Sequence, residues 1–366
     1  TTGDADFKNH FSIGADLGWQ TIDELIHPNL GNAVEGTDVL ANQTMNQTSA
    51  GVFALDRVEL GPQWGAFLSL RYDDVTCKVD DFIGTLSGDN TYKRGTGRFG
   101  LTWNPASDFG LYASWGTGFL PPGTEELSNN PNAFGGFNKA LKPAYSHGEE
   151  IGGRGSIGSH FVYDVALFYL ATENDFGRYR ITSRPLETFY GNVGSTNRYG
   201  LETSLAWYPI EPLAVRLAYT YSHFKYVTVE TLDASGSTYT GTWLPNSPQH
   251  QLYLDVEYKI TPALTVGAAL EYVSAWYLDS TNRVYQFDPV NYPNVYYGQT
   301  SPYALVHVRL GYKFDLGGVP FQLLLSGRNI FSVLYYGFTE PDPDGNSYQP
   351  AATASWTVGL RVGVGK

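Results

Sequence analysis

The chain has 366 residues, of which 15% are aromatic, 16% are charged and 41 are glycine, and its formal net charge is −13. The negative charge argues against nucleic acid as a partner, and the single cysteine, Cys77, excludes an internal disulfide. The charged fraction of 16% is below the roughly one quarter that is usual in soluble proteins. No shift of composition divides the chain, so we expect one domain over residues 1–366.

Fourteen strand-like segments recur along the chain. They lie at about residues 8–20, 49–59, 62–74, 93–104, 108–119, 145–157, 160–180, 186–208, 212–228, 246–259, 263–278, 301–314, 319–338 and 350–365. No segment has a convincing period of 3.6 residues. No run of about 18 apolar residues exists that could form a transmembrane helix. The pattern predicts an all-β fold.

The segment Arg198–Phe224 shows most clearly how these strands are built. Alternate residues from Tyr199 to Trp207 are mostly apolar, the residues between them are polar or small, and the alternation resumes at Leu213 after a turn at Pro209–Pro212. Because side chains alternate between the two faces of a strand, each limb has one apolar and one polar face. Nine or more such residues with aromatics towards the ends suit a strand that crosses a bilayer at a tilt.

Short and long connections alternate between the predicted strands. The short turns are Leu60–Pro62, Asn104–Ser107, Gly158–Ser159, Pro209–Glu211, Thr261–Pro262 and Asp315–Gly318. The longer connections are Thr21–Thr48, Asp74–Tyr92, Leu120–Ala144, Ile181–Pro185, Val229–Pro245, Asp279–Thr300 and Thr339–Gln349. Outer-membrane barrels have short periplasmic turns and long extracellular loops, so this order predicts a transmembrane antiparallel β-barrel in the outer membrane, surrounded by lipid. A soluble sandwich, propeller or jelly roll is the alternative, but its strands would be shorter and its loops unsorted.

Five loose motifs follow one another in a fixed order. They are GVFALDRVELGPQWGAFLSLRYDDV (Gly51–Val75), LYASWGTGFLPPGTEEL (Leu111–Leu127), ALKPAYSHGEEIGGRG (Ala140–Gly155), FYGNVGSTNRYGLETSLAWYP (Phe189–Pro209) and LSGRNIFSVLYY (Leu325–Tyr336). Together they resemble the barrel of the TonB-dependent outer-membrane receptors and cover nearly the whole chain.

The chain also departs from that family. The family barrel has 22 strands, an N-terminal plug and a TonB-contacting box, whereas about 14 strands are visible here, with no counterpart of the plug or the box. We expect a processed or truncated chain at Thr1, with the remaining strands and the plug supplied by further sequence or by a partner chain. Closure of these strands into a narrower pore is the alternative. Lys366 stands where the family has a terminal aromatic residue, which trimming of the end would explain.

The resemblance implies energised import of a bulky nutrient such as a ferric siderophore or cobalamin. Capture by the loops would precede a plug rearrangement driven by the TonB complex, which would act only through the plug. A passive pore without a plug, or a structural barrel subunit of a larger envelope assembly, is the alternative. No Ser/His/Asp grouping and no metal-binding His pair stands out, so we predict no enzymatic activity, no cofactor and no metal site.

Two long connections are rich in aromatic residues with a few cations, which suits a bulky ferric ligand. The candidate ligand contacts are Phe134, Phe137, Lys139, Lys142, Arg283, Tyr285, Phe287, Tyr292, Tyr296 and Tyr297. Tyrosines at loop bases can equally be anchors at the membrane interface.

A second set of charged residues lies on the polar faces of the predicted strands and is expected to face the lumen. It consists of Arg71, Arg98, Glu150, Arg154, Glu202, Arg216, Asp255, Glu257, Glu271, Arg309, Lys313 and Arg361. These residues would either solvate the interior and pair across neighbouring strands, or dock a plug and line a substrate route.

Overall fold

The computed structural model describes residues 2–3, 7–31, 34–84, 86–181, 184–192, 194–228, 240–288, 292–342 and 345–363. Side chains are described over these ranges except at 2–3, 178–180, 185–186, 188, 285–288, 292–297, 340–342 and 345–347.

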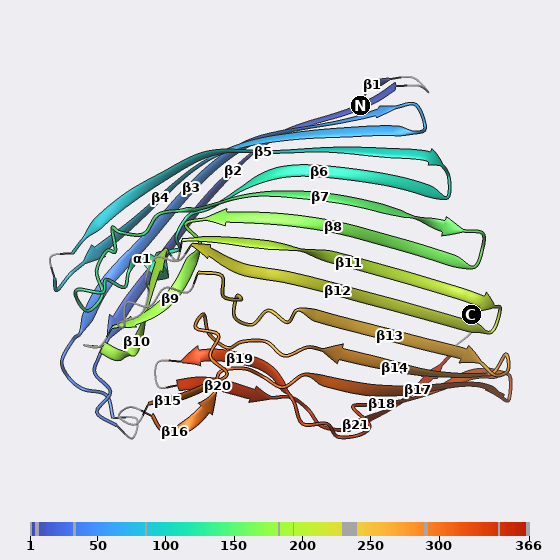
Figure 1. The fold of residues 1–366 in the computed structure, drawn as a ribbon. Helices are drawn as coiled ribbons and strands as arrows, with labels where there is room; N and C mark the ends of the chain where they lie inside the picture. Colours follow the sequence, from blue (N-terminus) through green and yellow to red (C-terminus); the bar gives the residue numbers. More distant parts are fainter. Residues whose placement is uncertain are drawn as a thin grey trace.

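One antiparallel sheet contains most of the strands, and each strand pairs with the next one along it (Figure 1). Its strands are β1 (Thr2–Gly3), β2 (Phe7–Ile26), β3 (Ala41–Leu60), β4 (Trp64–Asp81), β5 (Gly88–Ala106), β6 (Phe109–Leu120), β7 (Ala144–Ile157), β8 (Phe161–Glu173), β11 (Ser195–Ile210), β12 (Leu213–Thr228), β13 (His250–Lys259), β14 (Leu264–Val273), β17 (Tyr303–Leu316), β18 (Val319–Arg328) and β21 (Ser355–Val362). Apart from the two-residue β1, these are the fourteen strands that the alternating pattern predicts. The predicted all-β fold is confirmed.

Three hairpins and one short helix lie outside this sheet. They are β9 (Phe176–Ile181) with β10 (Arg184–Asn192), β15 (Tyr285–Asp288) with β16 (Tyr292–Tyr297), β19 (Tyr336–Asp342) with β20 (Gly345–Pro350), and α1 (Thr124–Leu127). No helix among the described residues is long and apolar enough to cross a membrane.

The connection between β8 and β11 differs from the prediction. We expected continuous strands over 160–180 and 186–208, but β8 ends at Glu173, β11 begins at Ser195, and the β9–β10 hairpin lies between them. Asn174 and Gly194, with φ values of 53° and 99°, turn the backbone out of the strand conformation on either side. Alternation alone did not reveal these breaks because β9 and β10 are themselves paired strands.

The two ends of the sheet differ in their connections. Six short turns lie at one end, which we call the turn end, and the longer connections lie at the other, the outer end (Figure 1). Strands β2–β5 are the longest, at 18 to 20 residues, and reach farther outward than predicted. The connection between β4 and β5 therefore shrinks to residues 82–87, far shorter than the predicted Asp74–Tyr92 loop.

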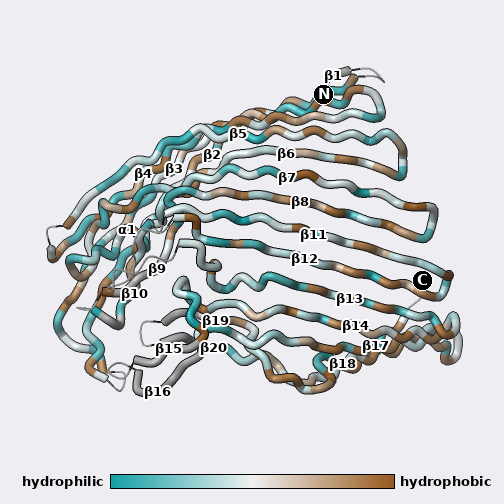
Figure 2. Tube along the Cα trace, in the orientation of Figure 1, coloured by the Kyte–Doolittle hydropathy of each residue, from teal (hydrophilic) through white to brown (hydrophobic). Residues whose placement is uncertain are grey.

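The two faces of the sheet differ in polarity, and hydrophilic and hydrophobic residues alternate along the strands (Figure 2). The apolar face has a stacked aromatic pair near the turn end, where the rings of Trp64 and Trp103 lie 5.6 Å apart. The polar face is the concave one, because α1 and the β9–β10 hairpin lie inside the curve of the sheet (Figure 1) and pack on residues in phase with it. A sheet with an apolar convex face and a charged concave face fits a barrel wall.

The sheet is open along two edges. Its order runs from β1 to β21, and no pairing joins these two ends among the described residues. Over the described residues, the fourteen strands therefore form an open sheet.

Candidate ligand and lumen sites

One face of the sheet carries every residue that the sequence analysis assigned to the lumen. Paired residues of adjacent strands share a face, and the strand register can be followed from Arg71 on β4 to Arg361 on β21 without a change of face. Arg71, Arg98, Glu150, Arg154, Glu202, Arg216, Asp255, Glu257, Glu271, Arg309, Lys313 and Arg361 all lie on this polar face.

A charged network on β12, β13 and β17 centres on Asp255, whose side chain is almost completely buried. Arg309 donates hydrogen bonds to both of its carboxylate oxygens, with Nη2 at 2.9 Å from Oδ1, and Nη1 of Arg216 lies 3.2 Å from the same oxygen. Arg309 also donates to Glu257 at 3.2 Å. The network has two cations and two anions, so its formal charges cancel, and the bidentate geometry fixes the Arg309 side chain.

Gly267 makes room for this arrangement. A Cβ atom at this position would lie 2.6 Å from Cζ of Arg309, because the guanidinium group crosses directly over the β14 backbone. A glycine in the middle of a strand weakens the strand. Gly267 is explained by the close approach of the Arg309 guanidinium to the β14 backbone, which leaves no room for a side chain.

A second network on β2 and β4 has one cation and two anions. Nη1 of Arg71 lies 2.7 Å from Asp16, and its Nη2 lies 2.7 Å from Asp73. Arg71 belongs to the predicted lumen set, whereas both aspartates were absent from it, although their phase within the predicted strands places them on the polar face. Elsewhere on this face Arg154, Glu202 and Arg361 form no ion pair with described residues.

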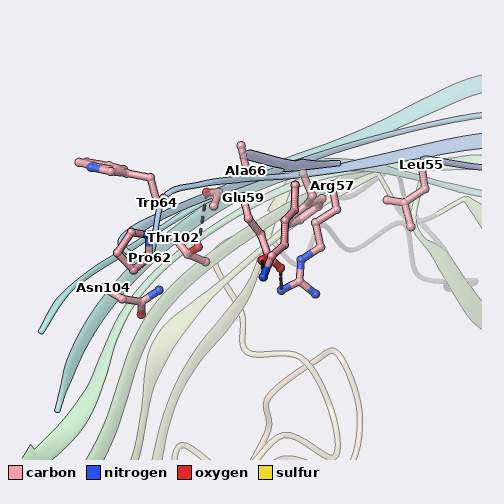
Figure 3. Close-up of a pocket in the computed structure, with 12 residues that line it drawn as sticks. Leu55, Arg57, Glu59, Pro62, Trp64, Ala66, Thr102 and Asn104 are labelled. Carbon is pink, nitrogen blue, oxygen red and sulfur yellow. Dashed lines mark hydrogen bonds and ion pairs between the residues drawn. The ribbon is translucent and has the colours of Figure 1, made fainter. Parts of the chain in front are cut away.

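A hollow opens at the turn end of β2–β5, with a volume of about 720 Å³ (Figure 3). Lys8, Arg57 and Glu59 line it together with Thr102 and Asn104. The Glu59 carboxylate lies 3.3 Å from Arg57 and 3.9 Å from Lys8, which leaves one formal positive charge in excess. An anionic segment or ligand would fit this balance better than a cation.

Residues 121–143 fold over the polar face at the outer end and pack on β3–β5. Leu127, Phe137 and Leu141 from this segment meet Cys77 and Tyr92 in a buried apolar cluster. Together with the β9–β10 hairpin and the outer ends of β3–β5, residues 121–143 form what we call the N-terminal loop body. Burial of this apolar cluster fixes the segment against the sheet.

Two polar side chains of this body hold residues 121–143 in place. Gln43, on β3, accepts a hydrogen bond from the Gly136 amide at 2.8 Å and donates one to the Ser128 carbonyl at 3.1 Å. Arg184, on β10, donates to the carbonyls of Ala133 and Asn130 at 2.5 and 2.7 Å. Gly136 has a φ of 82°, a conformation that favours glycine. Both side chains lie outside the predicted site, and no spacing in the sequence connects them to residues 121–143.

The candidate ligand contacts of this segment occupy different environments. Phe134 is 48% exposed, and its ring centroid lies 5.0 Å from Cζ of Arg184. Lys139 and Lys142 are exposed. Phe137 is 6% exposed and belongs to the apolar cluster. The structure thus gives Phe137 a packing role, and contact of any of these residues with a ligand stays a prediction.

The connections of the other half of the sheet meet in a second assembly, which we call the C-terminal loop body. It consists of the described parts of 240–249, 274–302 and 329–354. Trp276 Nε1 donates a hydrogen bond to the Thr339 hydroxyl at 3.1 Å, and that hydroxyl donates in turn to the Asn246 side chain. Asn282 donates to the Trp243 carbonyl at 2.9 Å. These polar contacts tie three connections together.

The remaining candidate contacts belong to the C-terminal loop body. Arg283 is exposed and precedes the β15–β16 hairpin. The other five are on this hairpin, in which Tyr285 pairs with Tyr297 along the backbone. The side chains of Tyr285, Phe287, Tyr292, Tyr296 and Tyr297 lie outside the described residues. Among the described residues, no group of three or more His, Cys, Asp or Glu side chains could hold a metal ion.

An antiparallel sheet of long strands with these two faces and these sorted connections defines the wall of a transmembrane β-barrel. A family model described as TonB dependent receptor-like, beta-barrel, matches residues 1–330. The chain belongs to the TonB-dependent receptor family, as its motifs predict.

Two curated relatives are also described as TonB-dependent receptors. The probable TonB-dependent siderophore receptor PiuA of Acinetobacter baumannii is 27% identical over 246 residues, which make up 64% of this chain and 32% of that protein. The probable TonB-dependent receptor BfrD of Bordetella pertussis is 24% identical over 233 residues, 62% of this chain and 30% of that protein. The matched part thus spans about a third of these relatives.

Solved structures show the same fold. The crystal structure of the siderophore receptor PiuA from Acinetobacter baumannii superimposes with a TM-score of 0.73 at 20% identity, over 99% of this chain and 54% of that one. The ferric citrate transporter FecA in the unliganded form gives a TM-score of 0.77 at 16% identity, over 99% and 52%. The chain therefore spans about half of each of these structures.

Proposed function

We propose that the chain is part of an outer-membrane receptor that imports a ferric siderophore. The observation that carries this proposal is the position of the two loop bodies at the outer end of a charged concave face. Phe134, Lys139, Lys142 and Arg283 are exposed on these bodies. Cations beside an aromatic ring suit an anionic, aromatic-rich ferric complex. The description of PiuA as a siderophore receptor supports the same ligand class.

The open edges of the sheet, at β1–β2 and at β21, support a barrel completed by further strands. Unpaired backbone N–H and C=O groups are not tolerated in the hydrocarbon layer, so strands from further sequence or from a partner chain must pair there. A plug from the same source would dock on the polar face, and TonB would act through that plug. This interpretation assigns no catalytic step to the chain, in keeping with a family of receptors.

Ligand binding by the protein purified from outer membranes tests this function. The probes are ferric citrate, a ferric tris-catecholate and cobalamin, with quenching of intrinsic fluorescence as the readout. We expect micromolar or tighter binding of a ferric probe, and about a tenfold loss in the double variant Lys139→Gln/Lys142→Gln because two cations near the ligand are removed. Lys259→Gln, at the turn end, is the matched control and should bind as the unchanged protein does.

The intact mass of the same preparation distinguishes an import receptor from the main alternative, a passive pore. A mass near twice 40.3 kDa would agree with an import receptor of which this chain is a part. A heat-modifiable protein of 40.3 kDa that conducts ions in a bilayer and binds none of the three probes would contradict the proposal. It would instead favour the passive pore.

A further inference from the structure

Four aromatic side chains and one lysine cluster near the outer ends of β11 and β12; Figure 1 shows the position of these strands in the sheet. The cluster consists of Tyr199, Tyr221, His223, Lys225 and Trp243, and we call it the rim cluster. The rings of Tyr199 and His223 stack with centroids 4.4 Å apart, and the Trp243 ring meets His223 edge-on at 4.6 Å. The Lys225 ammonium lies 4.5 Å from the centroid of Trp243.

The register places the rim cluster on the apolar, convex face of the sheet. Tyr199 pairs with His223 across β11 and β12, and the backbone of Lys225 forms an isolated β-bridge with that of Trp243. Leu217, Tyr219 and Tyr221 precede them in the same phase on β12. The cluster therefore faces away from the lumen and stands directly above an apolar surface.

Among the described residues, no acidic side chain balances the charge of the rim cluster. Lys225 forms no ion pair with any described residue. One positive charge therefore remains at the rim.

The rim differs on β4 and β5, where the lysines of the same face are neutralised. Nζ of Lys93 lies 2.9 Å from Asp74, and Nζ of Lys78 lies 2.8 Å from Asp80. If these residues only anchored the barrel at the membrane interface, there would be no reason for Lys78 and Lys93 to be paired and Lys225 unpaired. Among the described residues, the contrast marks the outer ends of β11 and β12 as a part of the rim without a counter-charge.

We propose that the rim cluster binds the phosphate-bearing headgroup of a membrane lipid, with Lys225 as the phosphate contact. An ammonium group is a compact donor of three hydrogen bonds to phosphate. The exposed ring of Tyr199 and the indole of Trp243 offer the amphipathic surface found at headgroup level, and the apolar face below receives the acyl chains. The inference rests on the proposed placement in a membrane but not on the imported ligand.

Lipid retention by the protein, purified in neutral detergent and analysed by native mass spectrometry, tests this proposal. The probes are monophosphoryl lipid A and diacylglycerol, which has no phosphate group, added at equal concentration. A lysine near a charged lipid surface contributes about 1 kcal/mol, which corresponds to about fivefold in affinity. We expect Lys225→Gln to lose about fivefold in retained monophosphoryl lipid A, and Lys225→Arg to retain it.

Lys93→Gln is the matched control, because its ammonium is already paired with Asp74. We expect less than a twofold change in that variant. Equal losses in Lys225→Gln and Lys93→Gln would overturn the proposal, as would an equal loss of both lipids or full competition by millimolar inorganic phosphate. A protein that retains lipid through Lys225 but binds no ferric probe would contradict only the import function.

Discussion

The two loop bodies at the outer end are held in different ways. The N-terminal body buries apolar side chains, among them Leu127 and Phe137, against the sheet. The C-terminal body is tied by hydrogen bonds that converge on Thr339, with Trp276 and Asn246 as its partners. Apolar burial is non-directional and tolerates adjustment, whereas a buried polar group is costly when one partner is lost. We therefore expect the two bodies to respond to different substitutions.

Leu127→Ala should have the largest effect. Leu127 is completely buried, so its truncation leaves a cavity that costs about 2–5 kcal/mol. The measurement is maleimide labelling of Cys77, which lies in the same cluster and beyond the membrane-crossing part of β4, since Asp74, Thr76 and Lys78 follow Tyr72 on the outward face. We expect labelling to accelerate by more than tenfold.

The pH dependence of this labelling follows from the burial of Cys77, which raises the pKa of the thiol to about 11. At pH 8 only about one thiol in a thousand is then ionised in the closed body. Because the pKa in the folded state lies above that of the free thiol, stability from this group is complete below about pH 8.5 and is lost as the pH rises through 11. Leu120→Ala, at an exposed leucine, is the control. If Cys77 in Leu120→Ala were labelled as fast as in Leu127→Ala, apolar burial would not be what holds the N-terminal loop body closed.

The strands could be predicted from the sequence because period 2 is imposed by the backbone itself. Lipid on one side and water on the other keep that period visible from Tyr199 to Trp207 and in the other predicted strands. The polar-face residues follow from the same phase, which is why Arg71 and Arg309 were found.

The loop bodies could not be predicted in this way. Residues 121–143 have no period that separates a core ring such as Phe137 from an exposed ring such as Phe134. Gln43 and Arg184 reach this segment from β3 and β10, over sequence separations of about 50 to 90 residues. Gln43 and Arg184 meet residues 121–143 only in the folded chain. The composition of residues 121–143 therefore identified them as a candidate ligand loop but did not reveal which side chains they contact.

Thr339→Val should have an intermediate effect, confined to the C-terminal body. The change keeps the shape of the side chain but leaves Trp276 Nε1 and the Asn246 side chain without their shared partner, which costs about 1–3 kcal/mol. Hydrogen exchange of the amides of residues 276–278 is the measurement, and we expect faster exchange with unchanged labelling of Cys77. Thr240→Val, at an exposed threonine of the same body, is the control. Faster labelling of Cys77 in Thr339→Val would show that the two bodies are coupled.

Phe134→Leu should have the smallest effect on stability. Phe134 is about half exposed, and its contact with Arg184 is a cation–π interaction worth about 0.5–1 kcal/mol at such a site. We expect Cys77 labelling to change by less than about fivefold, while the affinity for a ferric probe falls about tenfold if the ring contacts the ligand. Phe137→Leu is the matched comparison, because its ring is buried in the apolar cluster and its loss should open the N-terminal body. Unchanged affinity in Phe134→Leu would remove this residue from the ligand site and leave the cations Lys139 and Lys142 as the candidates on that body.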